Sequence, residues 1–138
     1  MMNPREIVEA FDQAVRARDE ASMQYLLDPD VVWAHSTGMP GPHLWRGSRD
    51  VIDYLLYQLP QQFEDSATVV EEYICDGQTV VALGYYSGVH PVTRRKLHAL
   101  FSHVFRVEEG RIMAFQQYTD TLQFVRAAQP KADEDLEP

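Results

Sequence analysis

Two ionisable residues, His35 and Asp120, stand among apolar and aromatic neighbours in the sequence. His35 shares one face of a predicted strand with Val31 and Trp33. Its imidazole, with an ordinary pKa of about 6.5, can take up and release protons near neutral pH. Asp120 follows the last strand-like run and could orient the ring and favour its charged form. The two residues are therefore predicted to be a catalytic pair.

Each of these residues also has a structural interpretation. The nitrogens of His35 could bond backbone or solvent at a strand end. Asp120 could cap a short C-terminal helix, because an aspartate before a run such as Leu122, Phe124 and Val125 is an ordinary helix start. The catalytic interpretation requires both side chains to meet in one apolar pocket.

Aromatic and strand residues around this pair are candidates for the wall of such a pocket, and aromatic walls favour a ring-bearing ligand. The hydroxyls of Ser102 and Tyr118, or a bound water, could stabilise negative charge on a substrate oxygen. The predicted substrate-binding residues are Phe11, Trp33, Trp45, Tyr54, Tyr57, Tyr86, His98, Leu100, Ser102, Val104 and Tyr118.

Metal ligands and cofactor motifs are not evident in the sequence. His35, His43, His98 and His103 have no paired spacing of the kind that places two ligands on one helical face, and no acidic cluster accompanies them. There is no glycine-rich phosphate loop, dinucleotide fingerprint or nucleophile elbow. We therefore expect no metal and no cofactor.

Length and composition limit the remaining possibilities. A chain of 138 residues with 45% hydrophobic and 11% aromatic content fits one globular domain. A formal net charge of −9 disfavours nucleic acid, and no apolar run approaches the roughly 20 residues that span a bilayer. The first residues do not resemble a signal peptide, so a cytoplasmic location is expected. The acidic segment 129–138 is predicted to be a disordered tail.

The first half of the chain predicts three helices. Asn3, Pro4 and Glu6 indicate a helix start with a capping box, and a second helix begins after Asp19. A short strand over 31–35 and an irregular loop over 36–47 lead to a third helix, which Ser48 caps and Pro60 ends.

The second half predicts four antiparallel strands from Thr68 onward. Asp76-Gly77 indicates a type I′ hairpin, and Glu109-Gly110 joins the last two strands. The run from Leu97 alternates with a period of two and is apolar on both faces, so one face covers a core and the other meets a further layer. This order of elements predicts the α+β class.

The segments DPDVVWAHS, WRGSRDVI and HVFRVEEGRIMAFQQYTDT resemble the nuclear transport factor two-like superfamily, in particular its SnoaL-like and ketosteroid-isomerase-like branch. This resemblance implies one conical α+β barrel over residues 1–128. Its curved, mainly antiparallel mixed sheet would wrap around the N-terminal helices. It also implies a deep apolar pocket and a homodimer formed through the outer face of the sheet.

Comparison with the enzymes of this superfamily separates their activities. His35 matches the position of the carboxylate base of ketosteroid isomerases, whereas Phe11 and Ser102 match their two oxyanion donors. A steroid isomerase is therefore disfavoured. Epoxide hydrolases of this fold need an arginine and a second aspartate that the segment GYYSGVH lacks. Asp120 matches the general base of SnoaL-like cyclases.

The sequence therefore favours a cofactor-independent enzyme of the isomerase or cyclase type. Such an enzyme would move a proton next to a carbonyl in a small apolar or polycyclic substrate, with His35 as base and Asp120 as its partner. The alternatives are a binding module that holds an apolar ligand without turnover and a structural dimer with a filled cavity.

Overall fold

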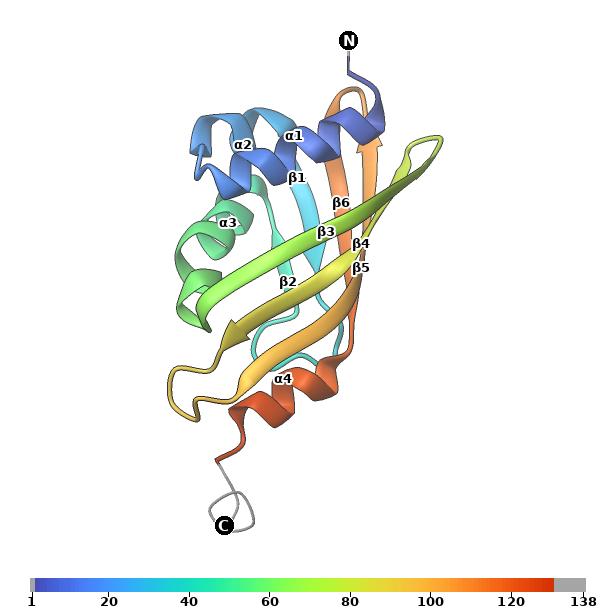
Figure 1. The fold of residues 1–138 in the computed structure, drawn as a ribbon. Coiled ribbons are helices and arrows are strands. Elements are labelled where there is room, and N and C mark those ends of the chain that lie inside the picture. Colours follow the sequence, from blue (N-terminus) through green and yellow to red (C-terminus); the bar gives the residue numbers. More distant parts are fainter. Residues whose placement is uncertain (1, 131–138) are drawn as a thin grey trace.

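A six-stranded curved sheet and four α-helices make up the fold, which a computed structural model describes over residues 2–130 (Figure 1). The predicted tail beyond residue 130 lies outside the described residues. The helices are α1 (Pro4–Arg16), α2 (Glu20–Leu26), α3 (Ser48–Asp53) and α4 (Thr121–Ala128). The strands are β1 (Leu27–Ala34), β2 (Leu44–Arg46), β3 (Glu64–Asp76), β4 (Thr79–Val89), β5 (Lys96–Glu108) and β6 (Arg111–Thr119).

The strands are ordered β2-β1-β6-β5-β4-β3 in the sheet. β1 pairs parallel with β6, where Trp33 lies opposite Phe115, and every other pair of neighbours is antiparallel. The predicted mixed, mainly antiparallel sheet is confirmed. Figure 1 shows the curved sheet with α1 and α2 at one end and α4 at the opposite end, while β3 passes in front of β1 and β6.

Both N-terminal helices begin where the sequence predicts. Asn3 accepts a hydrogen bond from the Glu6 amide, and the Glu6 carboxylate accepts one from the Asn3 amide, which completes the capping box. Asp19 caps α2 by accepting from the Ser22 amide and hydroxyl. The apolar face of α1 then packs into the core through Ile7, Val8, Phe11 and Ala14.

The segment from Ser36 to Pro60 differs most from its prediction. The predicted loop contains the short strand β2, which pairs with β1. The predicted third helix is divided into α3, a π-helical turn η1 (Tyr54–Gln58) and a 3-10 turn η2 (Leu59–Gln61). Gly47, with φ 88°, takes the N-cap position that Ser48 was predicted to fill. The wider π turn accompanies an inward, buried Tyr54.

The two hairpins of the sheet use different turns. Asp76 pairs with Thr79, so Gly77, with φ 61°, and Gln78 form the loop. In a two-residue loop, a glycine with positive φ at the first position alone is typical of a type II′ turn. The sequence predicted a type I′ turn at this hairpin. At the second hairpin both Glu109 (φ 51°) and Gly110 (φ 77°) have the positive φ of a type I′ turn.

One face of β5 points into the core and the other points outward. The inward residues are Leu97, Ala99, Phe101, His103, Phe105 and Val107. The main core lies between the sheet and α1, α2 and α3. A smaller core lies under α4, where Phe124 packs with Met39, Leu97 and Ala99.

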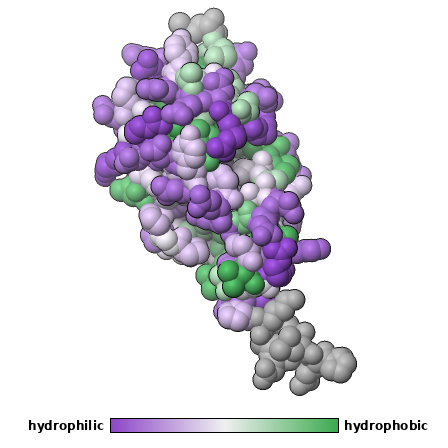
Figure 2. Space-filling model, turned by 90° about the vertical axis from the view of Figure 1, so that its left-hand side faces the viewer, coloured by the Kyte–Doolittle hydropathy of each residue, from purple (hydrophilic) through white to green (hydrophobic). Residues whose placement is uncertain are grey.

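The surface seen from the left of Figure 1 is mainly hydrophilic, with hydrophobic residues in small separate groups (Figure 2). No described helix is long and apolar enough to span a membrane.

Candidate functional site

His35 lies directly after β1, on the inward face of the sheet. Its amide donates to the carbonyl of His43 at 2.8 Å, which fixes the backbone. Its ring packs edge-on against the paired rings of Trp45 and Tyr54, with ring centroids 4.7 and 5.3 Å away, and the residue is 8% exposed. Burial, and then the nearby His43, lower the pKa of His35 to about 4. The imidazole is therefore uncharged at neutral pH.

The ring nitrogens of His35 receive no hydrogen bond from the described part of the chain, since its one bond is made by the backbone amide. An uncharged imidazole has one donor and one acceptor nitrogen. His35 therefore presents an unoccupied proton acceptor in an aromatic environment.

A second group of buried polar residues joins three strands. Gln117 on β6 donates from Nε2 to the hydroxyl of Tyr86 on β4 at 2.9 Å. The same hydroxyl makes a short hydrogen bond with Nε2 of His103 on β5. His103 stacks on Phe101 with ring centroids 3.8 Å apart. We call Tyr86, His103 and Gln117 the inner polar triad.

Ser36 attaches the end of β1 to this triad. Its hydroxyl donates to the Gln117 carbonyl at 2.9 Å, and its amide donates to the Gln117 side-chain oxygen at 3.3 Å. Because Ser36 follows His35 directly, the same two bonds fix the position of His35 relative to β6. The parallel pairing of β1 with β6 brings the two segments together.

His35 and His103 are close enough for the charge of one to change the pKa of the other. Burial, and then the charge interaction with His35, lower the pKa of His103 to about 3. Burial raises the pKa of Tyr86, and Tyr54 raises it again. Both histidines are therefore held uncharged, and Tyr86 keeps its proton at any ordinary pH.

Asp12 on α1 and Tyr73 on β3 form a third polar contact, which is half-buried. The Tyr73 hydroxyl donates to the Asp12 carboxylate at 2.6 Å. Burial raises the pKa of Asp12 to about 6, although the Tyr73 hydrogen bond and Arg16 act in the opposite direction. Neither residue was predicted as a site residue, and no motif identified them.

Five of the predicted pocket residues do lie on the inward side. Phe11, Trp33, Trp45 and Tyr54 are each at most 9% exposed, and Tyr86 belongs to the inner polar triad. Trp33 stacks on Phe115 with centroids 3.8 Å apart, and its ring also contacts Phe11. Of the five, Trp45 and Tyr54 contact the ring of His35 directly.

The other six lie elsewhere. Tyr57 is 52% exposed beneath Arg18. The remaining five lie on the outer face of the sheet, because they alternate with the inward residues of β5 and β6. These five are His98, Leu100, Ser102, Val104 and Tyr118. Their expected place beside His35 is corrected accordingly, and Ser102 and Tyr118 do not reach the inner face.

Asp120 does not meet His35. Its side chain is exposed, and its carboxylate accepts a hydrogen bond from the Gln123 amide side chain at 3.1 Å. It precedes α4 in the N-cap position, but its side chain does not bond the helix backbone. Among residues 2–130 no hydrogen bond or ion pair joins it to His35. The structure thus corrects the predicted pair.

His103 and Gln117 are the site residues that sequence reasoning missed. Both interrupt a buried alternation of aromatic residues, His103 between Phe101 and Phe105, and Gln117 two residues after Phe115. A polar residue on an otherwise apolar strand face must find a buried partner. That interruption was the available signal.

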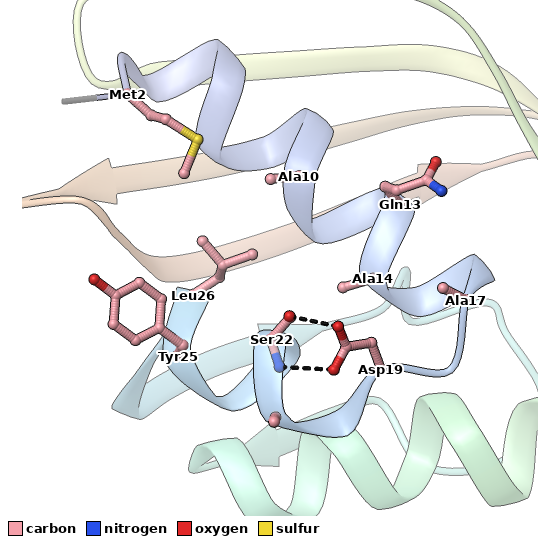
Figure 3. Close-up of a pocket in the computed structure, with 10 residues that line it drawn as sticks. Met2, Ala10, Gln13, Ala14, Ala17, Asp19, Ser22, Tyr25 and Leu26 are labelled. Carbon is pink, nitrogen blue, oxygen red and sulfur yellow. Dashed lines mark hydrogen bonds between the residues drawn. The ribbon is translucent and has the colours of Figure 1, made fainter.

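A groove of about 440 Å³ lies between α1 and α2 (Figure 3). Ala10, Ala14, Leu26 and Tyr25 line it, and no predicted site residue contributes to it. Over the described residues no group of three or more His, Cys, Asp or Glu side chains is arranged to hold a metal ion.

Comparison with known proteins agrees with the cone-shaped fold. Residues 8–115 match the SnoaL-like domain family. An NTF2-like protein from Burkholderia thailandensis is similar in structure, with a TM-score of 0.87 and 28% identity over 94% of this chain and 100% of that chain. An NTF2-like protein of unknown function from Burkholderia pseudomallei has a TM-score of 0.78 and 29% identity, over 92% of this chain and 98% of that chain. TerC, co-crystallised with polyporic acid, has a TM-score of 0.77 and 21% identity, over 90% of this chain and 96% of that chain. No curated protein matches the sequence.

Proposed function

We propose that this chain, which belongs to the SnoaL-like domain family, is a cofactor-independent isomerase or cyclase that moves a proton next to a carbonyl group. His35 is the base in this proposal. The observation that carries it is the His35 imidazole, which packs edge-on against Trp45 and Tyr54 and whose ring nitrogens have no hydrogen-bond partner in the described chain.

The protonation state of His35 suits this role. With its pKa lowered to about 4, the imidazole is uncharged at neutral pH and can accept a proton without first losing one. A low pKa also makes it a weak base in the empty site. Negative charge that develops on a bound enolate would raise the pKa of His35, so the substrate itself would increase its basicity.

The substrate class follows from the lining. Trp45 and Tyr54 present flat, largely apolar rings against the base, which favours a ring-bearing, largely apolar ketone. A protein of similar fold, TerC, was co-crystallised with polyporic acid, which supports a small organic molecule as the class of ligand.

The proposal can be tested without knowing the natural substrate. An active base exchanges protons on the carbon beside a ketone for deuterium, which ¹H NMR follows in D2O for probes such as 2-tetralone and 1-indanone. We expect wild-type protein to accelerate this exchange. In His35→Gln the acceleration should be at least 10²-fold smaller. The matched control is His98→Gln, on the outer face of the sheet, which should retain it.

A binding module is the alternative, and the same experiment separates it from an enzyme. In that case the ketones bind, as line broadening or a shift of protein resonances shows, but their protons exchange no faster than in buffer. Equal exchange by wild type and His35→Gln would also contradict the proposed role of His35.

We also propose that the chain forms a homodimer through the outer face of the sheet. Leu100 and Tyr118 are 65% and 57% exposed there, on neighbouring strands. Exposed apolar residues gathered on a strand face typically mark a contact with another layer. A second copy of the chain would cover them.

A further inference from the structure

The indole Nε1 of Trp33 is completely enclosed and has no hydrogen-bond partner, and no other side-chain nitrogen or oxygen among residues 2–130 is both. Trp33 is 3% exposed. An indole nitrogen can only donate a hydrogen bond. Leaving such a donor buried without an acceptor costs free energy, so native proteins rarely do so without a functional or structural reason.

The surroundings of Trp33 prevent it from finding a partner by rotation. Its ring stacks on Phe115 with an angle of 13° between the planes, while Phe11 and Phe105 contact it from other directions. The indole is therefore held in one orientation by three aromatic rings, none of which carries a hydrogen-bond acceptor in its side chain.

Trp33 and His35 are two residues apart on the inward face of one chain segment, and both are buried. Two residues of extended chain span about 6.6 Å. This span separates the two Cα atoms, and alternate side chains of a strand project from the same face, so one ligand on the inward face can meet both side chains.

We propose that the indole N–H of Trp33 donates a hydrogen bond to the carbonyl oxygen of the substrate while His35 removes the proton from the adjacent carbon. This inference rests on the proposed function. His35 takes the proton, the C–H electron pair forms the new C=C bond, and the carbonyl π pair moves onto oxygen as an enolate. The enolate oxygen keeps the Trp33 hydrogen bond, and His35 returns the proton to the substrate.

Other donors in the interior are already engaged or distant. The Tyr86 hydroxyl is shared with His103 and Gln117. Ser102 and Tyr118 lie on the outer face of the sheet. In this proposal Trp33 is the fully enclosed donor that gains a partner when a ligand binds, and a donor of this kind in a dry site stabilises developing charge strongly.

The first test observes the donor directly. The chain has two tryptophans, so a ¹⁵N-labelled sample gives two indole N–H resonances, which Trp45→Phe assigns. The probe is 4-nitrophenol, whose ionised oxygen resembles an enolate. We expect the Trp33 indole proton to move downfield as the probe saturates the protein. Binding that leaves this resonance unchanged, or no binding of the probe, would overturn the proposal.

The second test removes only the donor. Replacing Trp33 with 3-benzothienylalanine puts sulfur where the N–H stood and preserves the shape of the ring. We expect probe affinity to fall at least tenfold and deuterium exchange of 2-tetralone to fall about 10²-fold. Tyr25→Phe, which removes an exposed hydroxyl on α2, is the control and should change neither.

Stability separates a ligand donor from a structural one. The free benzothienylalanine protein should be at least as stable as wild type, because the N–H has no partner to lose. A clear loss of thermal stability would show a structural hydrogen bond and overturn the proposal. If the Trp33 resonance shifts but wild type exchanges no protons, the proposed enzyme fails while Trp33 remains the ligand donor.

Discussion

The hydroxyl of Tyr86 on β4 bonds Nε2 of His103 on β5 inside the cone, where both rings contact Phe101. Gln117 on β6 donates to the same hydroxyl, so one oxygen connects three neighbouring strands. Because all three groups are buried, each depends on the others for its hydrogen bonds. The inner polar triad thereby fixes the part of the sheet that faces His35.

Tyr86→Phe should reveal this dependence. Removing the hydroxyl leaves buried nitrogens of His103 and Gln117 without their partner, which should lower the free energy of unfolding by about 1–3 kcal/mol. Urea denaturation measures the change. The adjacent substitution Tyr85→Phe, whose ring lies on the outer face beside His98, should change stability by less than about 0.5 kcal/mol. Equal effects of the two substitutions would contradict the role of the triad.

The buried histidines should make the fold less stable as pH falls below about 6.5. In the folded chain the pKa values of His35 and His103 are lowered to about 4 and about 3. Between the unfolded and folded pKa values only the unfolded chain takes up these protons, so stability is lost in that range. Urea unfolding at pH 7, 6 and 5 should show this loss. In His103→Gln the free energy of unfolding should fall less steeply with decreasing pH, by about 1 kcal/mol per pH unit. An unchanged pH dependence would contradict burial of an uncharged His103.

Asp12 should make the fold less stable as pH rises, the opposite of the effect of the buried histidines. Its pKa is raised from 3.8 to about 6, so the folded chain holds this proton more tightly and stability falls as pH rises from about 4 to 6. Asp12→Asn keeps an acceptor for Tyr73 and removes the charge. At pH 8 it should therefore be more stable than wild type by about 1–2 kcal/mol.

The matched control for that substitution is Asp65→Asn, at an exposed position with φ 51° that asparagine tolerates. It should change stability at pH 8 by less than about 0.5 kcal/mol. A destabilised Asp12→Asn protein would show that Asp12 is ionised and favourably paired at neutral pH.

The outer face of the sheet can be tested by the oligomeric state. Leu100→Glu and Tyr118→Glu place charge on the proposed interface and should convert a dimer into a folded monomer, measured by light scattering after size exclusion. Tyr25→Glu on α2, where the side chain is 71% exposed, should leave the dimer intact. A wild-type protein that is monomeric at micromolar concentration would contradict the proposed dimer.

Local signals in the sequence predicted much of the fold. The helix start at Asn3, the two hairpins and the alternation of β5 depend on neighbouring residues, and the structure contains all of them. β2 was missed because three residues pair with β1 only through a tertiary contact. The division of the third helix at Tyr54 likewise depends on packing rather than on propensity.

The site was harder to predict because both faces of β5 carry apolar residues. Leu100 and Val104 made the outer face resemble a pocket wall, whereas the aromatic face with Phe101 and Phe105 turned inward and brought His103 with it. Asp120 could not be placed from sequence, since a residue at the end of a strand can face a cavity or begin a helix. His35 was placed correctly on the buried side because Val31 and Trp33 share its face.

The proposed function requires His35 to be an uncharged base inside the cone at neutral pH. NMR of protein labelled with ¹³C at histidine Cε1, titrated from pH 8 to pH 5, tests this directly. We predict that the His35 resonance, assigned with His35→Gln, keeps the shift of an uncharged imidazole throughout, because its pKa is about 4. A midpoint near the ordinary value of about 6.5 would show a solvated ring and contradict the account.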